Sequence, residues 1–162
     1  MDAFKEFEMA DNVRVTRECA VKDLDKALGA AIQAHLAEYQ MAEIESSTLM
    51  CCETVSTQKK KSVFGGSEKA IQAVLLTKKM LVWAEKISGK TTSAGSAKLD
   101  QIDMRDYEST AMFDVISDSG VNITGRYTDS KQTGQLFIAL DDGPAGKKFR
   151  ELLREAIKSF KE

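Results

Sequence analysis

The chain has 162 residues, 43% of them hydrophobic and 30% charged, with a formal net charge of −2, which is the composition of an ordinary soluble domain. This composition excludes a membrane-spanning helical protein, because no apolar run approaches the ~20 residues that a transmembrane helix needs. The first residues, MDAFKEFEMADNV, lack the basic and apolar segments of a secretion signal, so we expect an intracellular, cytoplasmic protein.

The first predicted element is an N-terminal helical extension, residues 1–45, whose best-defined part runs from residue 21 to residue 39. Before it, NVRV (12–15) alternates like an extended segment. Within the helix, apolar side chains recur every three or four residues: Val21, Leu24, Leu28, Ile32, Leu36 and Tyr39. A stripe of this kind must be buried within the chain or against another chain. Its centre is therefore a candidate interaction surface: Leu24, Leu28, Ile32 and Leu36.

From residue 46 onward the chain consists of short apolar or alternating runs separated by Gly, Ser, Lys or Asp. These runs predict seven strands: 48–57, 70–77, 80–87, 98–104, 111–117, 121–127 and 135–140. Connections this short favour antiparallel pairing, because a parallel crossover needs about a dozen residues. The segments 117–120 and 128–134 are predicted hairpin turns.

The last predicted element is a C-terminal amphipathic helix. Pro144 suits the first helical turn. After it, apolar residues recur with helical spacing: Phe149, Leu152, Leu153, Ala156, Ile157 and Phe160. We expect this helix to close one end of the strand assembly.

Three stretches resemble the bacterial pleckstrin-homology-like domains: AVLLTKKMLVW (73–83), KLDQIDMRDYE (98–108) and GVNITGRYTDSKQTGQLFIALDDGPAGKKFRELLREAI (120–157). The resemblance covers about residues 46–160. It implies an α+β fold with a seven-stranded antiparallel barrel or sandwich capped by a C-terminal helix. The expected organisation is an N-terminal extension, residues 1–45, and a pleckstrin-homology-like domain, residues 46–162.

Basic residues concentrate in residues 59–90, which carry eight lysines against two acidic residues. In phosphoinositide-binding members of the family, a lysine near the end of the first strand and a basic-x-Arg pair on the second hold the lipid phosphates. By this resemblance the candidate anionic-lipid contacts are Lys59, Lys60, Lys61, Lys69, Lys78 and Lys79. The second strand lacks the arginine, which weakens headgroup recognition. Such a lysine cluster also suits a solvated surface, and the acidic overall charge disfavours nucleic acid.

Cysteine and histidine are scarce. Cys19, Cys51 and Cys52 show no Cys-x-x-Cys spacing and His35 is the single histidine, so we expect reduced thiols, no metal site and no cofactor. Cys51 and Cys52 are adjacent in a predicted strand, so their side chains point to opposite faces, one in the core and the other half-exposed. No neighbour in the sequence would activate either thiol as a nucleophile.

The segment AEKISGKTT (84–92) contains a Gly-Lys-Thr that is typical of phosphate loops. The full motif requires glycine where this chain has Ala84, and a helix that starts within the loop. The residues after Lys90 are rich in Gly, Ser and Thr, so SGKTTSAGS (88–96) is interpreted as a connection between two strands.

These patterns favour a non-catalytic binding module that acts through protein–protein contact or self-association. The alternative is a peripheral membrane adaptor that uses the lysines of the loop after the first strand. A P-loop-like nucleotide enzyme is a remote third hypothesis. No arrangement of catalytic residues is expected.

Overall fold

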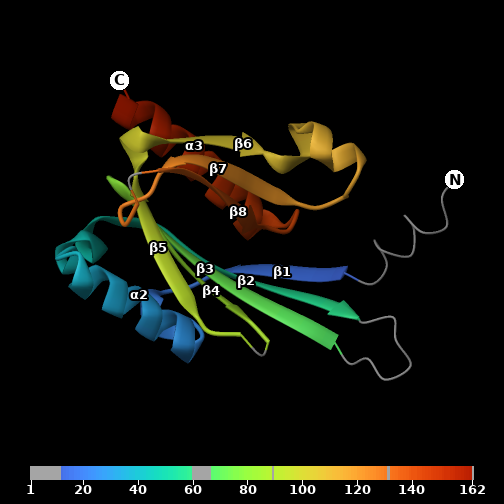
Figure 1. Ribbon diagram of the computed structural model, residues 1–162, viewed down its shortest axis with the longest axis horizontal. Coiled ribbons are helices and arrows are strands. Elements are labelled where there is room, and N and C mark those ends of the chain that lie inside the picture. Colours follow the sequence, from blue (N-terminus) through green and yellow to red (C-terminus); the bar gives the residue numbers. More distant parts are fainter. Residues whose placement is uncertain (1–11, 60–66, 89, 131, 162) are drawn as a thin grey trace, which may run out of the picture.

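The computed structural model describes residues 12–59, 67–88, 90–130 and 132–161. In these residues, the helix α2 (Lys26–Glu38) covers one face of a five-stranded sheet. The other face of that sheet meets a three-stranded sheet and the helix α3 (Pro144–Lys161) (Figure 1). The predicted α+β class, with antiparallel strands and a helix toward each end, is confirmed.

The five-stranded sheet follows chain order, β1-β2-β3-β4-β5. Its strands are β1 (Asn12–Glu18), β2 (Thr48–Lys59), β3 (Ser67–Thr77), β4 (Met80–Ile87) and β5 (Ser93–Lys98). The NVRV segment, predicted to be extended, forms β1 and pairs with β2. The pairing of β2 with β3 shifts between Thr48 and Met50, so Leu49 has no partner opposite it and forms a bulge.

The three-stranded sheet contains β6 (Ile102–Asp106), β7 (Gly120–Arg126) and β8 (Thr133–Ala139), in that order. The β7–β8 hairpin around 128–134 is confirmed. Val121 and Ile123, which alternate along β7, are fully buried. The helix α3 begins at Pro144, also as predicted, and buries Phe149, Leu153 and Ile157.

Five short 3-10 helices join these elements: η1 (Val21–Asp23), η2 (Ala42–Ser47), η3 (Leu99–Gln101), η4 (Tyr107–Ser109) and η5 (Ala111–Asp114). The helix α2 starts after Asp25, whose carboxylate accepts a hydrogen bond from the Ala27 N–H at 3.0 Å. The Lys86 ammonium on β4 lies 3.0 Å from the same carboxylate. This bond to Lys86 lowers the pKa of Asp25 and anchors the start of α2 to the sheet.

Two apolar cores lie on the two faces of the five-stranded sheet. The larger core fills the space between the two sheets and α3, with Trp83, Ile138 and Phe149 among its members. The smaller core lies under α2, where the predicted stripe packs on residues such as Leu75 and Val82. The five-stranded sheet is therefore buried on both faces over much of β3 and β4, which explains their continuous apolar sequences.

Two strand assignments from the sequence are wrong. Residues 111–117, predicted to form a strand, contain η5, and the Tyr107 hydroxyl donates to the Ile116 carbonyl at 2.6 Å, which holds the segment as a loop. Residues 93–96, interpreted as part of a connection, instead belong to β5, which pairs with β4. The hairpin turn predicted at 117–120 is therefore also wrong, because this segment leads from a loop into β7. The run 98–104, predicted as one strand, is divided among the last residue of β5, η3 and the start of β6.

The sequence of β5 does not resemble a strand because its residues are small. They are small where the strand packs against Trp83. A Cβ on Gly95 would lie 2.7 Å from Trp83 Cζ2, so glycine lets the indole lie against the backbone. Within the described residues, seven strands still follow residue 46, but the two sheets are not joined into a closed barrel.

Candidate functional site

The lysines proposed from the sequence do not gather at one place. Lys60, Lys61 and the side chain of Lys59 lie outside the described part of the chain. Lys69 is exposed near the start of β3, whereas Lys78 and Lys79 are exposed just after its end. Nine residues of extended strand span ~30 Å, so among the described lysines of this set only Lys78 and Lys79 share a site.

The turn that carries Lys78 and Lys79 has a fixed backbone. The Thr77 hydroxyl is fully buried, accepts from the Met80 N–H at 2.9 Å and donates to the Met80 carbonyl at 3.2 Å. The Lys78 N–H donates to the Ser47 carbonyl at 3.2 Å. The turn therefore presents both lysines from a held position, while the side chains themselves extend into solvent.

A groove with apolar walls lies beside this turn and along α3. It has a volume of about 530 Å³ and is open to solvent. We call it the α3 groove and define it by its lining residues: Leu49, Lys78, Lys79, Leu152, Glu155, Ala156, Ser159 and Phe160. Leu49 reaches it from the β2 bulge.

The α3 side of this groove continues the helix's apolar stripe beyond its buried part. Phe149, Leu153 and Ile157 face the core, whereas Leu152, Ala156 and Phe160 lie one position round the helix and line the groove. Phe160 is 39% exposed and Leu49 is 38% exposed, so two large apolar side chains meet solvent at one groove. The α3 groove therefore presents an apolar strip that no described residue covers.

The charges at the α3 groove are mostly positive. Lys78 and Lys79 form no ion pair with any described residue, unlike Lys86, Lys148 and Lys161, which each pair with a carboxylate. Glu155 is the single acidic residue that lines this groove. An occupant with apolar side chains and negative charge would thus match both the walls and the rim of the groove.

Sequence reasoning identified Lys78, Lys79 and the helical apolar residues, but did not join them into one surface. The apolar stripe in residues 149–160 is broader than one buried helix face requires, and this width could have indicated an additional apolar surface on the helix. Leu49 was missed because nothing in the sequence marks the bulge that turns it out of the sheet.

The candidate interaction stripe on the N-terminal helix is covered by the chain itself. Leu28, Ile32 and Leu36 are fully buried, and Leu24 is 8% exposed. All four pack in the core under α2 against residues of the five-stranded sheet. These side chains are consequently not exposed to a second chain.

His35 lies on α2 beside that stripe and is buried. Its Nε2 is 2.8 Å from Ser96 Oγ on β5, and the Ser96 hydroxyl in turn donates to Thr128 Oγ1 at 2.8 Å. Burial lowers the pKa of His35. This hydrogen-bonded series joins α2 to β5 and to the turn after β7, and its central serine, Ser96, is fully buried.

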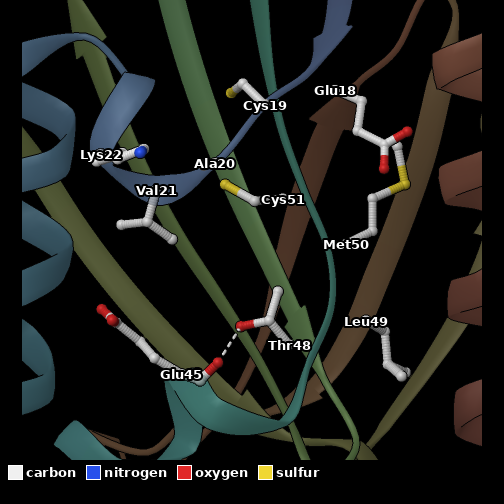
Figure 2. A pocket seen from close by; sticks show the side chains of 10 residues that line it. All are labelled: Glu18, Cys19, Ala20, Val21, Lys22, Glu45, Thr48, Leu49, Met50 and Cys51. Carbon is white, nitrogen blue, oxygen red and sulfur yellow. Dashed lines mark hydrogen bonds between the residues drawn. The ribbon is translucent and has the colours of Figure 1, made fainter.

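A second groove contains two of the three cysteines. We call it the thiol groove; it has a volume of about 650 Å³, and its lining residues are Glu18, Cys19, Ala20, Val21, Lys22, Glu45, Thr48, Leu49, Met50 and Cys51 (Figure 2). Cys51 is 4% exposed, and Cys52 on the opposite strand face is fully buried. The expectation that one of these two is half-exposed is wrong, because the core under α2 covers the Cys51 side.

Burial governs the titration of these thiols. It raises the pKa of Cys51 to about 12, and it also raises the pKa of Cys19 and of Cys52. Arg17 opposes the rise at Cys19 through its positive charge. All three thiols are therefore predominantly protonated at neutral pH, which does not favour a resting nucleophile.

The Gly-Lys-Thr segment does not have the geometry of a phosphate loop. Gly89 lies outside the described residues, and residues 93–98 after Lys90 form strand β5 where a phosphate loop requires a helix. The described residues contain no group of three or more His, Cys, Asp or Glu side chains placed to share a metal ion. Neither described helix is long and apolar enough to cross a bilayer.

Comparison with known proteins finds no matching family, no matching curated protein and no matching solved structure. The α3 groove and the thiol groove are therefore interpreted from their own geometry and chemistry.

Proposed function

We propose that this chain is a non-catalytic binding module of pleckstrin-homology-like type, and that its α3 groove binds an acidic, apolar segment of a protein partner. The observation that carries this proposal is the juxtaposition of exposed apolar side chains with two lysines that form no ion pair with any described residue. Aromatic and aliphatic anchors in a desolvated centre, with charges at the rim, are the usual composition of a protein-binding surface.

The order of the elements supports the pleckstrin-homology-like part of the proposal. The strands β2 to β5 form consecutive antiparallel neighbours, β6 to β8 form a second sheet, and α3 follows and packs between them. This is the layout expected from the resemblance in residues 46–160, with β1 and α2 added to the first sheet. The pleckstrin-homology-like barrel or sandwich that the resemblance implies is part of the proposal.

A protein segment suits the α3 groove better than a membrane does. Two lysines near an anionic leaflet contribute about 1 kcal/mol each, which is weak attraction for a whole protein. Glu155 at the same groove opposes that attraction. A peptide can instead place single carboxylates beside Lys78 and Lys79 and apolar side chains on Leu152 and Phe160. A peripheral membrane adaptor is therefore the runner-up.

A nucleotide-using enzyme has less support. Lys86, which precedes the Gly-Lys-Thr, is engaged with the carboxylate of Asp25 at 3.0 Å. The chain continues into β5 after Thr92, so no helix starts within this segment as a phosphate loop requires.

The test is a titration of the full chain with a fluorescent acidic, apolar peptide. Residues 1–11, MDAFKEFEMAD, have this chemistry, with four acidic residues, two phenylalanines and two methionines. A synthetic peptide of this sequence is therefore a suitable probe. Its control is the same peptide with Asn and Gln in place of Asp and Glu.

The proposal predicts that Lys78→Glu with Lys79→Glu weakens peptide binding about tenfold or more, equivalent to about 1.4 kcal/mol. Phe160→Ala should also weaken binding by removing apolar contact. The matched control is Lys26→Glu with Lys147→Glu, which changes the net charge equally at exposed sites outside the α3 groove. Equal loss in both double variants, or no difference between the two peptides, would contradict the proposal.

Measurement of the solution mass separates the two kinds of protein partner. If the occupant comes from a second copy, the full chain associates at high concentration and the Lys78→Glu, Lys79→Glu variant is monomeric. A monomer that still binds the peptide indicates a partner of different sequence. Sedimentation with phosphatidylserine vesicles that exceeds peptide binding in strength would favour the membrane alternative.

A further inference from the structure

Cys19 and Cys51 are directly opposite each other at the end of the β1–β2 ladder. The last pair within the strands is Glu18 with Cys52, and the next step in the same register pairs Cys19 with Cys51. The Cys19 N–H donates to the Cys51 carbonyl at 3.0 Å, so the pairing continues to this position. Opposite residues of this type have Cα atoms ~5.5 Å apart, which lies within the range that a disulfide bridges.

The two side chains also lie on the same face of the sheet. Cys51 belongs to the core under α2, and Cys19 packs against that core. Figure 2 shows both sulfur atoms on the α2 side of the strands, whereas Cys52 belongs to the core on the opposite face. The effect of each thiol on the pKa of the other reflects this proximity.

Access differs between the two thiols. Both line the solvent-open thiol groove, but Cys19 is partly exposed and Cys51 is nearly covered. A soluble disulfide reagent therefore reaches Cys19 first. Cys51 is then placed to react with the mixed disulfide that forms on Cys19. Cys52 is fully buried and lines neither groove, so it serves as an internal reference.

We propose that Cys19 and Cys51 form a reversible cross-strand disulfide when the protein meets a small-molecule disulfide such as oxidised glutathione. The Cys19 thiolate attacks one sulfur of the oxidant, forming a mixed disulfide and releasing one thiolate. The Cys51 thiolate then attacks Cys19 Sγ, forming the intramolecular bond and releasing the second thiolate. The two protons from the cysteines go to the two released thiolates, so two glutathione molecules are the products.

This bond would close a loop of chain that contains η1, α2 and η2. Residues 19 and 51 flank the segment that connects β1 to β2, and α2 lies within this segment. Oxidation would therefore restrain the end of β1 and the position of α2 against the sheet. Because burial raises the pKa values of both thiols, the reaction is slow at neutral pH and accelerates as pH rises.

The test incubates the full chain with oxidised glutathione, alkylates the remaining thiols and maps the products by mass spectrometry. Cys52→Ala leaves only the proposed pair and should form an intramolecular disulfide as the wild type does. Cys51→Ala leaves Cys19 and Cys52 and should stop at the mixed disulfide on Cys19. Reduced glutathione should reverse the wild-type bond.

A disulfide in Cys51→Ala, an intermolecular bond in the wild type, or a mixed disulfide that persists in Cys52→Ala would overturn the proposal. Since Cys51→Ala removes a buried side chain, its unfolding midpoint is measured first. Cys19→Ala changes the more exposed partner and gives a second test: no bond between Cys51 and Cys52 should form in it. Wild-type bonding that resists reduced glutathione would refute the reversibility.

Discussion

Arg14 on β1 forms an ion pair with Asp118, which lies in the loop before β7, and thereby links the edge of one sheet to the other sheet. The same Nη1 donates to the Ser119 carbonyl at 2.9 Å, and Nε donates to Ser56 Oγ on β2 at 2.9 Å. The guanidinium also lies 5.8 Å from the centre of the Phe137 ring on β8. Arg14 is thus a tie between two sheets that no strand pairing joins.

This arrangement predicts that Arg14→Ala destabilises the protein by about 1–3 kcal/mol, because it removes the hydrogen bonds that the guanidinium donates to the Asp118 carboxylate and to the Ser119 carbonyl. Urea denaturation measures the change. The control is Lys148→Ala, which removes an ion pair with Glu18 whose two side chains are 52% and 46% exposed. That exposed pair should contribute less than about 1 kcal/mol. Equal losses in the two variants would show that Arg14 has no special role.

Phe149 tests whether α3 closes the larger core. Its side chain is fully buried among residues of both sheets. Phe149→Ala should lower the free energy of unfolding by about 3–5 kcal/mol, the range for deletion of a buried aromatic side chain. Phe160→Ala on the same helix is the control, because that ring is 39% exposed. A loss below about 1 kcal/mol for Phe149→Ala would mean that the core does not depend on this contact.

The sequence predicts α3 and the β7–β8 hairpin correctly but misses β5. The difference is whether the signal for the element is local in the sequence. Pro144 and the spacing from Phe149 onward are local signals, and burial on one face preserves them. The strand β5 pairs with β4 so that Gly95 lies opposite Trp83 and accommodates its indole, a cross-strand contact that the small residues of 93–97 do not signal in the sequence. Conversely, Met112, Val115 and Ile116 look like a strand but are 53%, 73% and 54% exposed.

His35 predicts a pH dependence of stability. Burial lowers its pKa in the folded protein, although the charges of Asp129 and Glu38 oppose the shift. The unfolded state therefore binds a proton more readily, with a pKa of about 6.5, and stability falls as pH decreases through that value. The loss is complete once pH is below the folded pKa, and the corresponding stability is fully present above the unfolded pKa.

Denaturation curves between about pH 7.5 and about pH 5.5 bracket the ordinary histidine value and measure this effect. His35→Gln keeps a group that can hydrogen-bond Ser96 but does not titrate. Its stability should change less with pH than that of the wild type over this interval. Identical slopes for the two proteins would show that His35 is not the titrating group.

The sequence predicted parts of the candidate sites only where a single residue type, such as lysine in a basic turn, marks the site. Lys78 and Lys79 were visible as a basic turn, but their association with Leu49 and Phe160 depends on a bulge in β2 and on the docking of α3. In the same way, the adjacency of Cys51 and Cys52 in the sequence obscured the spatial pair, which is Cys51 with Cys19. Cross-strand register places these residues together, and register is decided by the whole sheet.

The last prediction concerns the membrane alternative. Because Lys78 and Lys79 are exposed and unpaired among the described residues, they should give weak sedimentation with phosphatidylserine vesicles at low ionic strength. At about 0.15 M salt the Debye length is about 8 Å, so this attraction should disappear. No preference among phosphoinositides is expected, since the sequence lacks the arginine that forms a bidentate contact with phosphate. Lys78→Ala with Lys79→Ala should reduce the low-salt signal more than Lys26→Ala with Lys147→Ala. Binding that resists salt, distinguishes phosphoinositide isomers and requires Lys78 and Lys79 would place the membrane adaptor above the protein-binding module.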